Sequence, residues 1–442
     1  MTSLQHIATW SAILLGLAIP ISTAASNTLL AVIVLLFALS GDYRNKFRVI
    51  ADNPLTFPIV LFCSAAALGC AYGLGSAGDK LHYLGKYLTL LVIPLMLPLF
   101  ADRTARVRAL AAFVAAMLLT LALSYGIRFD WLPAGLRVLV DSRDPAMWGA
   151  GNPVVFKLHI THGFLMAIAA FLLLLAARHV PSSRLRWTCM ALSLLAACNV
   201  LLMVKGRTGF VVLAVLGAYL VFQRFGRKGI LIAALGFALS VGAAYQWSGS
   251  FHQRIQETVA EAEAWQEGKG DKTATGLRLD YYSNTLAIIK DHPWLGVGTG
   301  GFERAYGERI RDTGMQPSNN PHNQYLLLMA QLGPAGLAVL LFLYAVFWRQ
   351  AGKLASPFQQ IARGVLLAIL IGNLFNSFML DFTERMFFAW ISGVLFAELS
   401  APHAATKTRK RKLPVFEGRG GLVAGLNPSS NKAMLDAADD DA

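Results

Sequence analysis

Two cations occupy an unexpected place in the sequence. Lys205 and Arg207 lie in the segment Val204-Lys-Gly-Arg-Thr-Gly, which leaves room for only a turn between two apolar runs. A glycine-containing break at membrane depth persists only where it is packed in protein or lines a cavity. The planar fork of donors on Arg207 suits a phosphate group, so this turn is predicted to hold an anion. The alternative is an interfacial arginine that extends to the lipid headgroups.

His322 is the candidate general base. It lies in Asn319-Asn-Pro-His-Asn-Gln-Tyr-Leu, where a long polar stretch meets an apolar run. Asn or Pro at such a junction starts a helix, and the positive end of a helix dipole favours the neutral imidazole. Neutral imidazole is the form that a general base requires. The alternative is an ordinary histidine in the cap region.

Further charged side chains precede and follow this junction. Arg278 falls in Thr275-Gly-Leu-Arg-Leu-Asp-Tyr-Tyr, where a solvated helix face or an ion pair with Asp280 is the default interpretation. Asp381, Glu384 and Arg385 form a charged turn between the last two apolar runs. These three either pair with one another, or one carboxylate orients a base.

Three other patterns are weaker than they first look. The glycines of Gly296-Val-Gly-Thr-Gly-Gly301 match a dinucleotide fingerprint, but no strand precedes them. His159 and His162 are three residues apart beside Lys157, with no carboxylate or cysteine near, so cavity lining is favoured over metal binding. The cysteines all lie in apolar runs without a CxxC motif, namely Cys63, Cys70, Cys189 and Cys198. The sequence thus predicts no metal and no cofactor.

The composition predicts the elements that position these residues. Hydrophobic residues make up 55% of the 442 positions and charged residues only 14%, and apolar runs of roughly 16–22 residues recur at the length that crosses a bilayer. The predicted fold class is an all-α polytopic membrane protein with about twelve transmembrane helices. The spans are expected near 5–22, 26–40, 55–75, 81–100, 107–126, 157–177, 187–204, 208–223, 229–247, 324–348, 361–380 and 386–399.

The net charge of +14 predicts an orientation rather than a nucleic-acid partner, because no nucleic-acid-binding motif accompanies it. Basic clusters fall in alternate connections, so both termini are predicted to be cytoplasmic. The clusters are Arg44/Lys46/Arg48, Arg103/Arg106/Arg108, Arg178/Arg184/Arg186, Arg224/Arg227/Lys228, Arg349/Lys353/Arg363 and Lys407 with Arg409–Lys412. The expected organisation is helices 1–9 in 1–247, an outer loop with amphipathic helices in 248–323, helices 10–12 in 324–400, and a basic, then disordered, cytoplasmic tail in 401–442.

Two segments carry a resemblance to a known family. The stretch from Asp291-His-Pro-Trp-Leu-Gly to Phe302, followed by Pro321-His-Asn-Gln-Tyr-Leu to Gly333, resembles the signature of the O-antigen ligase and O-antigen polymerase superfamily. Arg207-Thr-Gly and Leu277-Arg-Leu fit in the same order. The resemblance implies a GT-C-like enzyme of the bacterial inner membrane. Such an enzyme transfers a glycan from an undecaprenyl-diphosphate carrier at the periplasmic face, without a metal or nucleotide sugar.

The same resemblance implies roles for individual residues. His322 would activate the acceptor hydroxyl, which in a ligase belongs to a sugar of lipid A–core, while Arg207 and Arg278 would bind the leaving diphosphate. Charge-assisted hydrogen bonds to phosphate can replace a metal ion. The further candidates for substrate binding are Lys205, His159, His162, Asp381 and Tyr325.

Other functions remain as alternatives. An O-antigen polymerase or a protein O-oligosaccharyltransferase would share these motifs; the ligase is favoured because the outer loop is of moderate size and no further soluble periplasmic domain is expected. A secondary transporter or lipid flippase is less favoured, since such proteins place ionisable residues at mid-span. Here the chemically capable residues gather at one membrane face, and there is no internal repeat.

Overall fold

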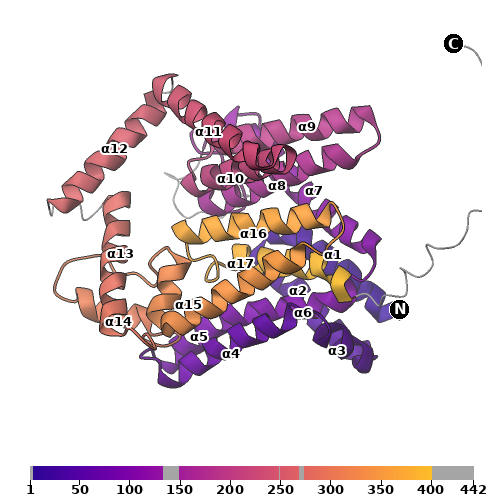
Figure 1. Ribbon diagram of the computed structural model, residues 1–442, viewed down its shortest axis with the longest axis horizontal. Coiled ribbons are helices and arrows are strands. Elements are labelled where there is room, and N and C mark those ends of the chain that lie inside the picture. The colour runs from indigo at the N-terminus through magenta and orange to yellow at the C-terminus, as the bar shows by residue number, and fades with distance from the viewer. Residues whose placement is uncertain (1–2, 133–148, 248, 268–272, 401–442) are drawn as a thin grey trace, which may run out of the picture. The chain divides into compact units, whose positions relative to one another are not determined.

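The computed structural model describes residues 3–132, 149–247, 249–267 and 273–400, and within these ranges the regular elements are helices (Figure 1). The first half of the chain forms α1 (Ser3–Ile21), α2 (Thr23–Leu39), α3 (Tyr43–Ala51), α4 (Thr56–Tyr72), α5 (Ala77–Leu88), η1 (Thr89–Leu91), α6 (Val92–Met96), η2 (Leu97–Leu99), α7 (Arg103–Arg128), α8 (His159–His179), α9 (Ser183–Cys198), η5 (Asn199–Met203) and α10 (Arg207–Phe225). The second half forms α11 (Arg227–Trp247), α12 (Gly249–Gln266), α13 (Ala274–Asp291), α14 (Phe302–Ile310), α15 (Gln324–Ala351), α16 (Phe358–Phe375), α17 (Phe382–Phe396) and η6 (Ala397–Ser400).

The predicted fold class, an all-α polytopic membrane protein, is confirmed. Each expected span overlaps a helix or a run of helices. Within the described residues, eight helices are long and apolar enough to cross a membrane, or nine if α2 and α3, bent by 119°, form one broken span. Twelve spans therefore remain a prediction. The fourth expected span corresponds to Ala77–Leu99, which is one of these candidates. It contains α5, η1, α6 and η2 in succession, and the sequence there includes Pro94 and Pro98.

A buried tryptophan of α17 lies at the centre of the helix packing. Trp390 is fully buried, and its indole N–H donates to the carbonyl of Ala12 in α1 at 2.8 Å. Gly16 makes room for it, since a Cβ at that position would come within 2.2 Å of the indole ring. The rings of Phe113 from α7 and Phe387 from α17 complete the cluster. Burying the polar end of the indole against a backbone acceptor fixes how α1 and α17 meet.

The glycine-rich segment before α14 is a packing element. A Cβ at Gly298 would lie 2.1 Å from the Cα of Gly73, so this backbone passes directly against the end of α4. Its N–H groups donate to protein carbonyls: that of Gly298 to Gln331 at 2.7 Å, and that of Thr299 to Gly69 at 3.0 Å. On the other side it packs against a kink in α15 at Gly333, whose φ is 64°. These glycines allow close approach between chain segments, and these amides are not free to cradle an anion.

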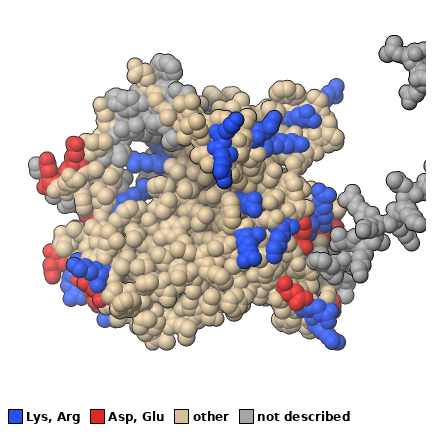
Figure 2. All heavy atoms as spheres, viewed as in Figure 1, with Lys and Arg blue, Asp and Glu red and all other residues tan. Residues whose placement is uncertain are grey.

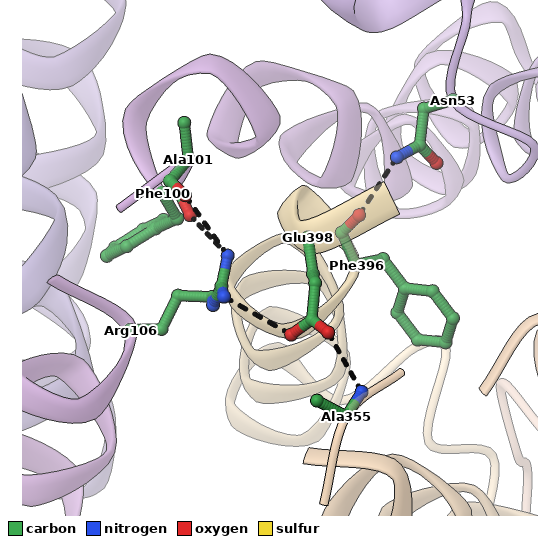
Figure 3. A network of polar contacts seen from close by, with 7 residues as sticks. All are labelled: Asn53, Phe100, Ala101, Arg106, Ala355, Phe396 and Glu398. Atoms are coloured by element: carbon green, nitrogen blue, oxygen red, sulfur yellow. Dashed lines mark hydrogen bonds and ion pairs between the residues drawn. The ribbon is translucent and has the colours of Figure 1, made fainter. Parts of the chain in front are cut away.

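A polar network ties together the chain segments at the other end of α15 and α16 (Figure 3). Arg106 of α7 forms an ion pair with Glu398 at 3.2 Å and donates to two backbone carbonyls directly after η2. Glu398 also accepts the N–H of Ala355 at 2.8 Å, and the side chain of Asn53 donates to the carbonyl of Phe396 at 3.0 Å. This network thus joins four segments that are distant in sequence. It lies at the end of α15 opposite to His322, because His322 precedes α15 and Ala355 follows it.

The helices of the outer loop lie beside the near ends of α15 and α16. Figure 1 shows α12, α13 and α14 together on the left, while α15, α16 and α17 run through the middle of the view. In Figure 2 an uncharged surface covers the lower central part of this face, basic side chains lie right of its centre, and acidic and basic side chains both lie at its left edge. An uncharged surface around a helical bundle, with charges at its ends, suits a membrane protein.

Candidate functional site

A tightly bonded loop presents His322 at the entrance of α15. Its φ of 52° lies in the left-handed region, which non-glycine residues rarely adopt. The side chain of Asn320 accepts the backbone N–H of His322 at 2.9 Å, and Asn323 caps α15 by accepting the N–H groups of Tyr325 and Leu326. The loop is thus held on both sides of the histidine. Strained backbone that its surroundings enforce is common at functional sites.

The imidazole of His322 lies between an amide and an aromatic ring. Its Nδ1 is 3.0 Å from the side-chain oxygen of Asn376, the residue that follows α16. The ring of Tyr281 stacks on it, with centroids 5.6 Å apart and an interplanar angle of 30°. No residue in the described ranges forms a hydrogen bond with Nε2. One nitrogen is therefore engaged by protein, and the other remains open to a substrate.

Arg278 lies on α13, the helix that also carries Tyr281. Arg278 is three residues before Tyr281, so the two side chains share one face of α13. The ion pair with Asp280 considered from the sequence is not formed; instead the carboxylate of Asp280 accepts the indole N–H of Trp265 at 2.7 Å. Arg278 remains half-buried, and no carboxylate within the described part of the chain pairs with it.

The start of α10 places Arg207 beside the start of α8. The segment before Arg207 begins with a π-helical turn, η5, an irregularity often found at functional sites. A Cβ at Gly206 would lie 2.5 Å from the carbonyl oxygen of His159, the first residue of α8. One turn further along α10, Gly209 packs directly on Gly163 of α8. These glycines are the reason that Arg207 and His159 can lie next to each other.

Arg278 is the residue whose charge acts on the other side chains of the candidate site. It interacts electrostatically with Arg207, with His159 and with His322. Arg278 therefore lies within electrostatic range of an arginine and two histidines that are distant from it in sequence. The positive charge of Arg207 also lowers the pKa of Arg278, although burial is the larger cause. Within the described residues, no carboxylate forms an ion pair with either arginine, and two such cations suit an anion such as a phosphate.

The same surroundings keep His322 neutral. Burial is the main cause that lowers its pKa; the hydrogen bond to Asn376 raises it, and the positive charge of Arg278 lowers it further. The imidazole is therefore in its basic, uncharged form near neutral pH, as a proton acceptor must be. The sequence predicted a neutral imidazole from the helix dipole, whereas burial and Arg278 are the causes in the structure.

Comparison with known families bears on the segment that contains these residues. The family model described as O-antigen ligase matches residues 191–341. This match supports the O-antigen ligase superfamily and covers about a third of the chain. The matched O-antigen ligase segment includes Arg207, Arg278 and His322, whereas Asn376 lies beyond its end. A comparison with curated proteins finds no match.

Three of the residues predicted to bind substrate have other environments. His162 is buried with both ring nitrogens engaged, Nδ1 by the N–H of Val155 and Nε2 by the side chain of Asn199, which favours a structural role. The hydroxyl of Tyr325 donates to the carbonyl of Leu370 at 2.8 Å and joins α15 to α16. Lys205 is exposed, and its backbone N–H donates to Asn152.

Asp381 is brought to the site through an intermediate residue. Its Oδ2 accepts a hydrogen bond from the side-chain amide of Asn376 at 2.7 Å. Burial raises the pKa of Asp381, while the positive charges of Lys86 and Arg385 lower it. Asn376, Tyr281 and Lys86 were not singled out in the sequence. An asparagine at the end of an apolar run was the one available signal for Asn376.

The site is built from cations, an imidazole and amides. Within the described ranges, no three His, Cys, Asp or Glu side chains are placed to hold a metal ion. The expectation that the enzyme uses neither metal nor cofactor remains a prediction. The arrangement can bind an anionic group through two guanidinium groups and accept a proton at one imidazole nitrogen.

Proposed function

We propose that the protein is an O-antigen ligase that transfers a glycan from undecaprenyl diphosphate to a sugar hydroxyl of lipid A–core. The reaction would take place at the periplasmic face of the bacterial inner membrane. The observation that supports the proposal is that Arg278 interacts electrostatically with both Arg207 and His322. An anion site beside a proton acceptor is what displacement of a diphosphate by a hydroxyl requires.

The proposed reaction is a single displacement. Nε2 of His322 removes the proton of the acceptor hydroxyl, and the oxygen attacks the anomeric carbon of the donor sugar. The bond from that carbon to the phosphate oxygen breaks, and its electrons leave with undecaprenyl diphosphate. Arg207 and Arg278 stabilise the negative charge that develops on this leaving group. The anomeric configuration is inverted, and the imidazolium then releases its proton to solvent. Retention in the NMR spectrum of the product would contradict this scheme.

Reconstitution with both substrates tests the activity. A ligase consumes lipid A–core together with the lipid-linked oligosaccharide, whereas an O-antigen polymerase elongates lipid-linked glycan alone. A protein O-oligosaccharyltransferase would need a polypeptide acceptor. Transfer that requires lipid A–core supports the ligase. A gradient-dependent flux through proteoliposomes that His322→Ala abolishes would favour a transporter or flippase instead.

Substitutions at the site test the residue roles. We expect His322→Gln to lower the transfer rate by about 10²–10⁴, the usual contribution of a general base. Arg207→Gln and Arg278→Gln should each lower it by roughly 10- to 150-fold, which corresponds to about 1.5–3 kcal/mol per charge-assisted hydrogen bond. Arg309→Gln is the control, because this exposed arginine pairs with Asp291 in the same loop and should leave transfer unchanged. Normal transfer by folded His322→Gln protein would refute the role of the base.

A further inference from the structure

Three polar side chains form a hydrogen-bonded chain that ends on His322. Asp381 Oδ2 accepts from the amide nitrogen of Asn376 at 2.7 Å, and the amide oxygen of Asn376 is 3.0 Å from Nδ1 of His322. Asn376 is buried, with 7% of its surface exposed. A buried asparagine amide has a donor end and an acceptor end, and each needs a matching partner. The partner on one side therefore determines which end faces the other side.

We infer that Asn376 is a positioning residue which, oriented by Asp381, fixes the Nδ1–H tautomer of His322 and leaves Nε2 free to accept a proton. An ionised carboxylate only accepts hydrogen bonds, so the NH₂ group of Asn376 must face Asp381. The amide oxygen then faces His322. Because this oxygen also only accepts, the hydrogen must lie on Nδ1. The inference rests on the proposed role of His322 as the base.

The hydrogen bonds from His322 through Asn376 require Asp381 to be ionised, and the charges around Asp381 affect this ionisation. Burial raises the pKa of Asp381 to about 6, whereas the positive charges of Lys86 in α5 and Arg385 in α17 lower it, so the carboxylate is ionised above that pH. Arg385 is held in place, since its Nε donates to the hydroxyl of Thr89 at 3.1 Å. The other carboxylate that interacts with Asp381 is Glu384, whose side chain accepts the hydroxyl of Thr161. Two cations thus face Asp381 against one carboxylate.

The backbone holds Asn376 in position independently of these contacts. Asn376 caps the end of α16 with an extended backbone, and its N–H donates to the carbonyl of Gly372 at 2.9 Å. Gly372 leaves space for the buried ring of Phe378, because a Cβ there would come within 2.0 Å of that ring. The turn is also tied to α15, since the N–H of Met379 donates to the side chain of Gln324 at 3.0 Å. The amide therefore has little freedom to move away from His322.

His162 provides a contrast within the same molecule. The N–H of Val155 donates to its Nδ1 at 3.2 Å, so this nitrogen must be unprotonated in the neutral ring. Nε2 then carries the hydrogen and donates to the side-chain oxygen of Asn199 at 3.0 Å. The two histidines thus hold opposite tautomers, each beside an asparagine oxygen. Of these two histidines, His322 has the asparagine oxygen at Nδ1 and His162 has it at Nε2.

The tautomer can be measured without an activity assay. The nine histidines of the full-length protein are labelled with ¹⁵N in their rings, and spectra are recorded well above pH 6.5, the approximate unperturbed pKa of histidine. The ¹⁵N chemical shift separates a protonated ring nitrogen from an unprotonated one, and the signals are assigned by their loss in His322→Gln and His162→Gln. We expect Nδ1–H for His322 and Nε2–H for His162. An Nε2–H tautomer at His322 in the unsubstituted protein would overturn the inference.

Two substitutions then test the cause. In Asn376→Ala, His322 should change to the Nε2–H form or to a mixture, and the transfer rate should fall roughly 10- to 100-fold, as is common when a residue that orients a functional histidine is lost. Asp381→Asn keeps the shape but replaces a carboxylate that only accepts with an amide that can accept or donate, so both orientations of Asn376 become possible and a mixture should also result. An unchanged Nδ1–H tautomer in either variant would contradict the proposed cause.

Asn373→Ala is the matched control. Asn373 is also buried, lies one turn earlier in α16, and donates to the hydroxyl of Tyr344 instead of contacting His322. Its loss should lower stability without changing the tautomer of His322; a changed tautomer there would contradict the specific role of Asn376. The proposed function fails separately, if folded His322→Gln retains full transfer whichever tautomer is observed.

Discussion

At the scale of single residues, the chemistry depends on a histidine that is kept uncharged while lying next to a cation. His322 is half-buried under Tyr281, and Arg278 adds a repulsive positive charge. Both effects lower its pKa, whereas the hydrogen bond from Nδ1 to Asn376 opposes them. A base within electrostatic range of an arginine avoids protonation in this way. The same arginine would thus bind the leaving group and keep the base active.

The pKa of His322 should therefore respond to the two arginines differently. In Arg278→Gln the repulsion is removed, so the pKa of His322 should rise toward its ordinary value of about 6.5. Arg207 acts on Arg278, and Arg207→Gln should change the pKa of His322 less. The titration of the ¹⁵N ring signals of His322 measures both effects. A lower pKa in Arg278→Gln would contradict the arrangement.

The dependence of the transfer rate on pH should follow the pKa of His322. Because only neutral His322 accepts a proton, transfer should increase with pH through its pKa, which lies below the ordinary value. The acidic limb of kcat/KM should thus lie below about pH 6.5, and the residual activity of Arg278→Gln should show this limb at higher pH.

At the scale of elements, the proposed anion site depends on the close approach of the N-terminal ends of α8 and α10. The Cα atoms and carbonyls of Gly163 and Gly209 face each other where α8 meets α10, and a Cβ at Gly209 would lie 2.9 Å from two backbone atoms of Gly163. Arg207 and His159 precede this contact by two and four residues. Any side chain at the contact must push the two helix starts apart.

Gly209→Ala should therefore impair both stability and transfer. The forced separation of α8 and α10 is expected to lower the free energy of unfolding by about 1–3 kcal/mol. A displacement of Arg207 by about 1 Å should slow transfer roughly 10- to 100-fold. Gly217→Ala is the control on the same helix, since nothing lies within 4 Å of its added Cβ. It should be neutral, or stabilise by roughly 0.5–1 kcal/mol. Thermal unfolding in detergent and the transfer rate measure both; equal behaviour of the two variants would refute the close-packing argument.

Much of this arrangement follows from sequence periodicity, but its contacts do not. Apolar runs predicted where the helices lie, and the glycines beside Arg207 predicted a break. The pairing of Asn376 with His322 joins residues 54 positions apart, and no local pattern reports a contact over such a separation. The span at 81–100 was expected, but its alternation between α-helical and 3-10 turns was not, because apolar length alone does not report the effect of proline on helix type.

At the scale of the whole molecule, α15 and α16 separate the candidate site from the polar network of Arg106 and Glu398. α16 begins at Phe358, whose ring contacts Arg106, and ends before Asn376. Its 18 residues span about 27 Å, close to the thickness of the hydrocarbon core. The basic connections predicted to be cytoplasmic include Arg106, while His322 lies at the other end. The proposed chemistry therefore requires the Arg106 end to face the cytoplasm.

Labelling of single cysteines tests this orientation. The native cysteines are free thiols, Cys63, Cys70, Cys189 and Cys198, and are first replaced by alanine. Asp312 and Lys353 are exposed residues on either side of α15, whose 28 residues cover about 42 Å and so reach across the bilayer. In intact spheroplasts a membrane-impermeant maleimide should label Asp312→Cys but not Lys353→Cys, which should react only after permeabilisation. Since undecaprenyl-diphosphate-linked glycan would be used on the periplasmic side, the reverse pattern would place His322 in the wrong compartment and exclude the proposed transfer.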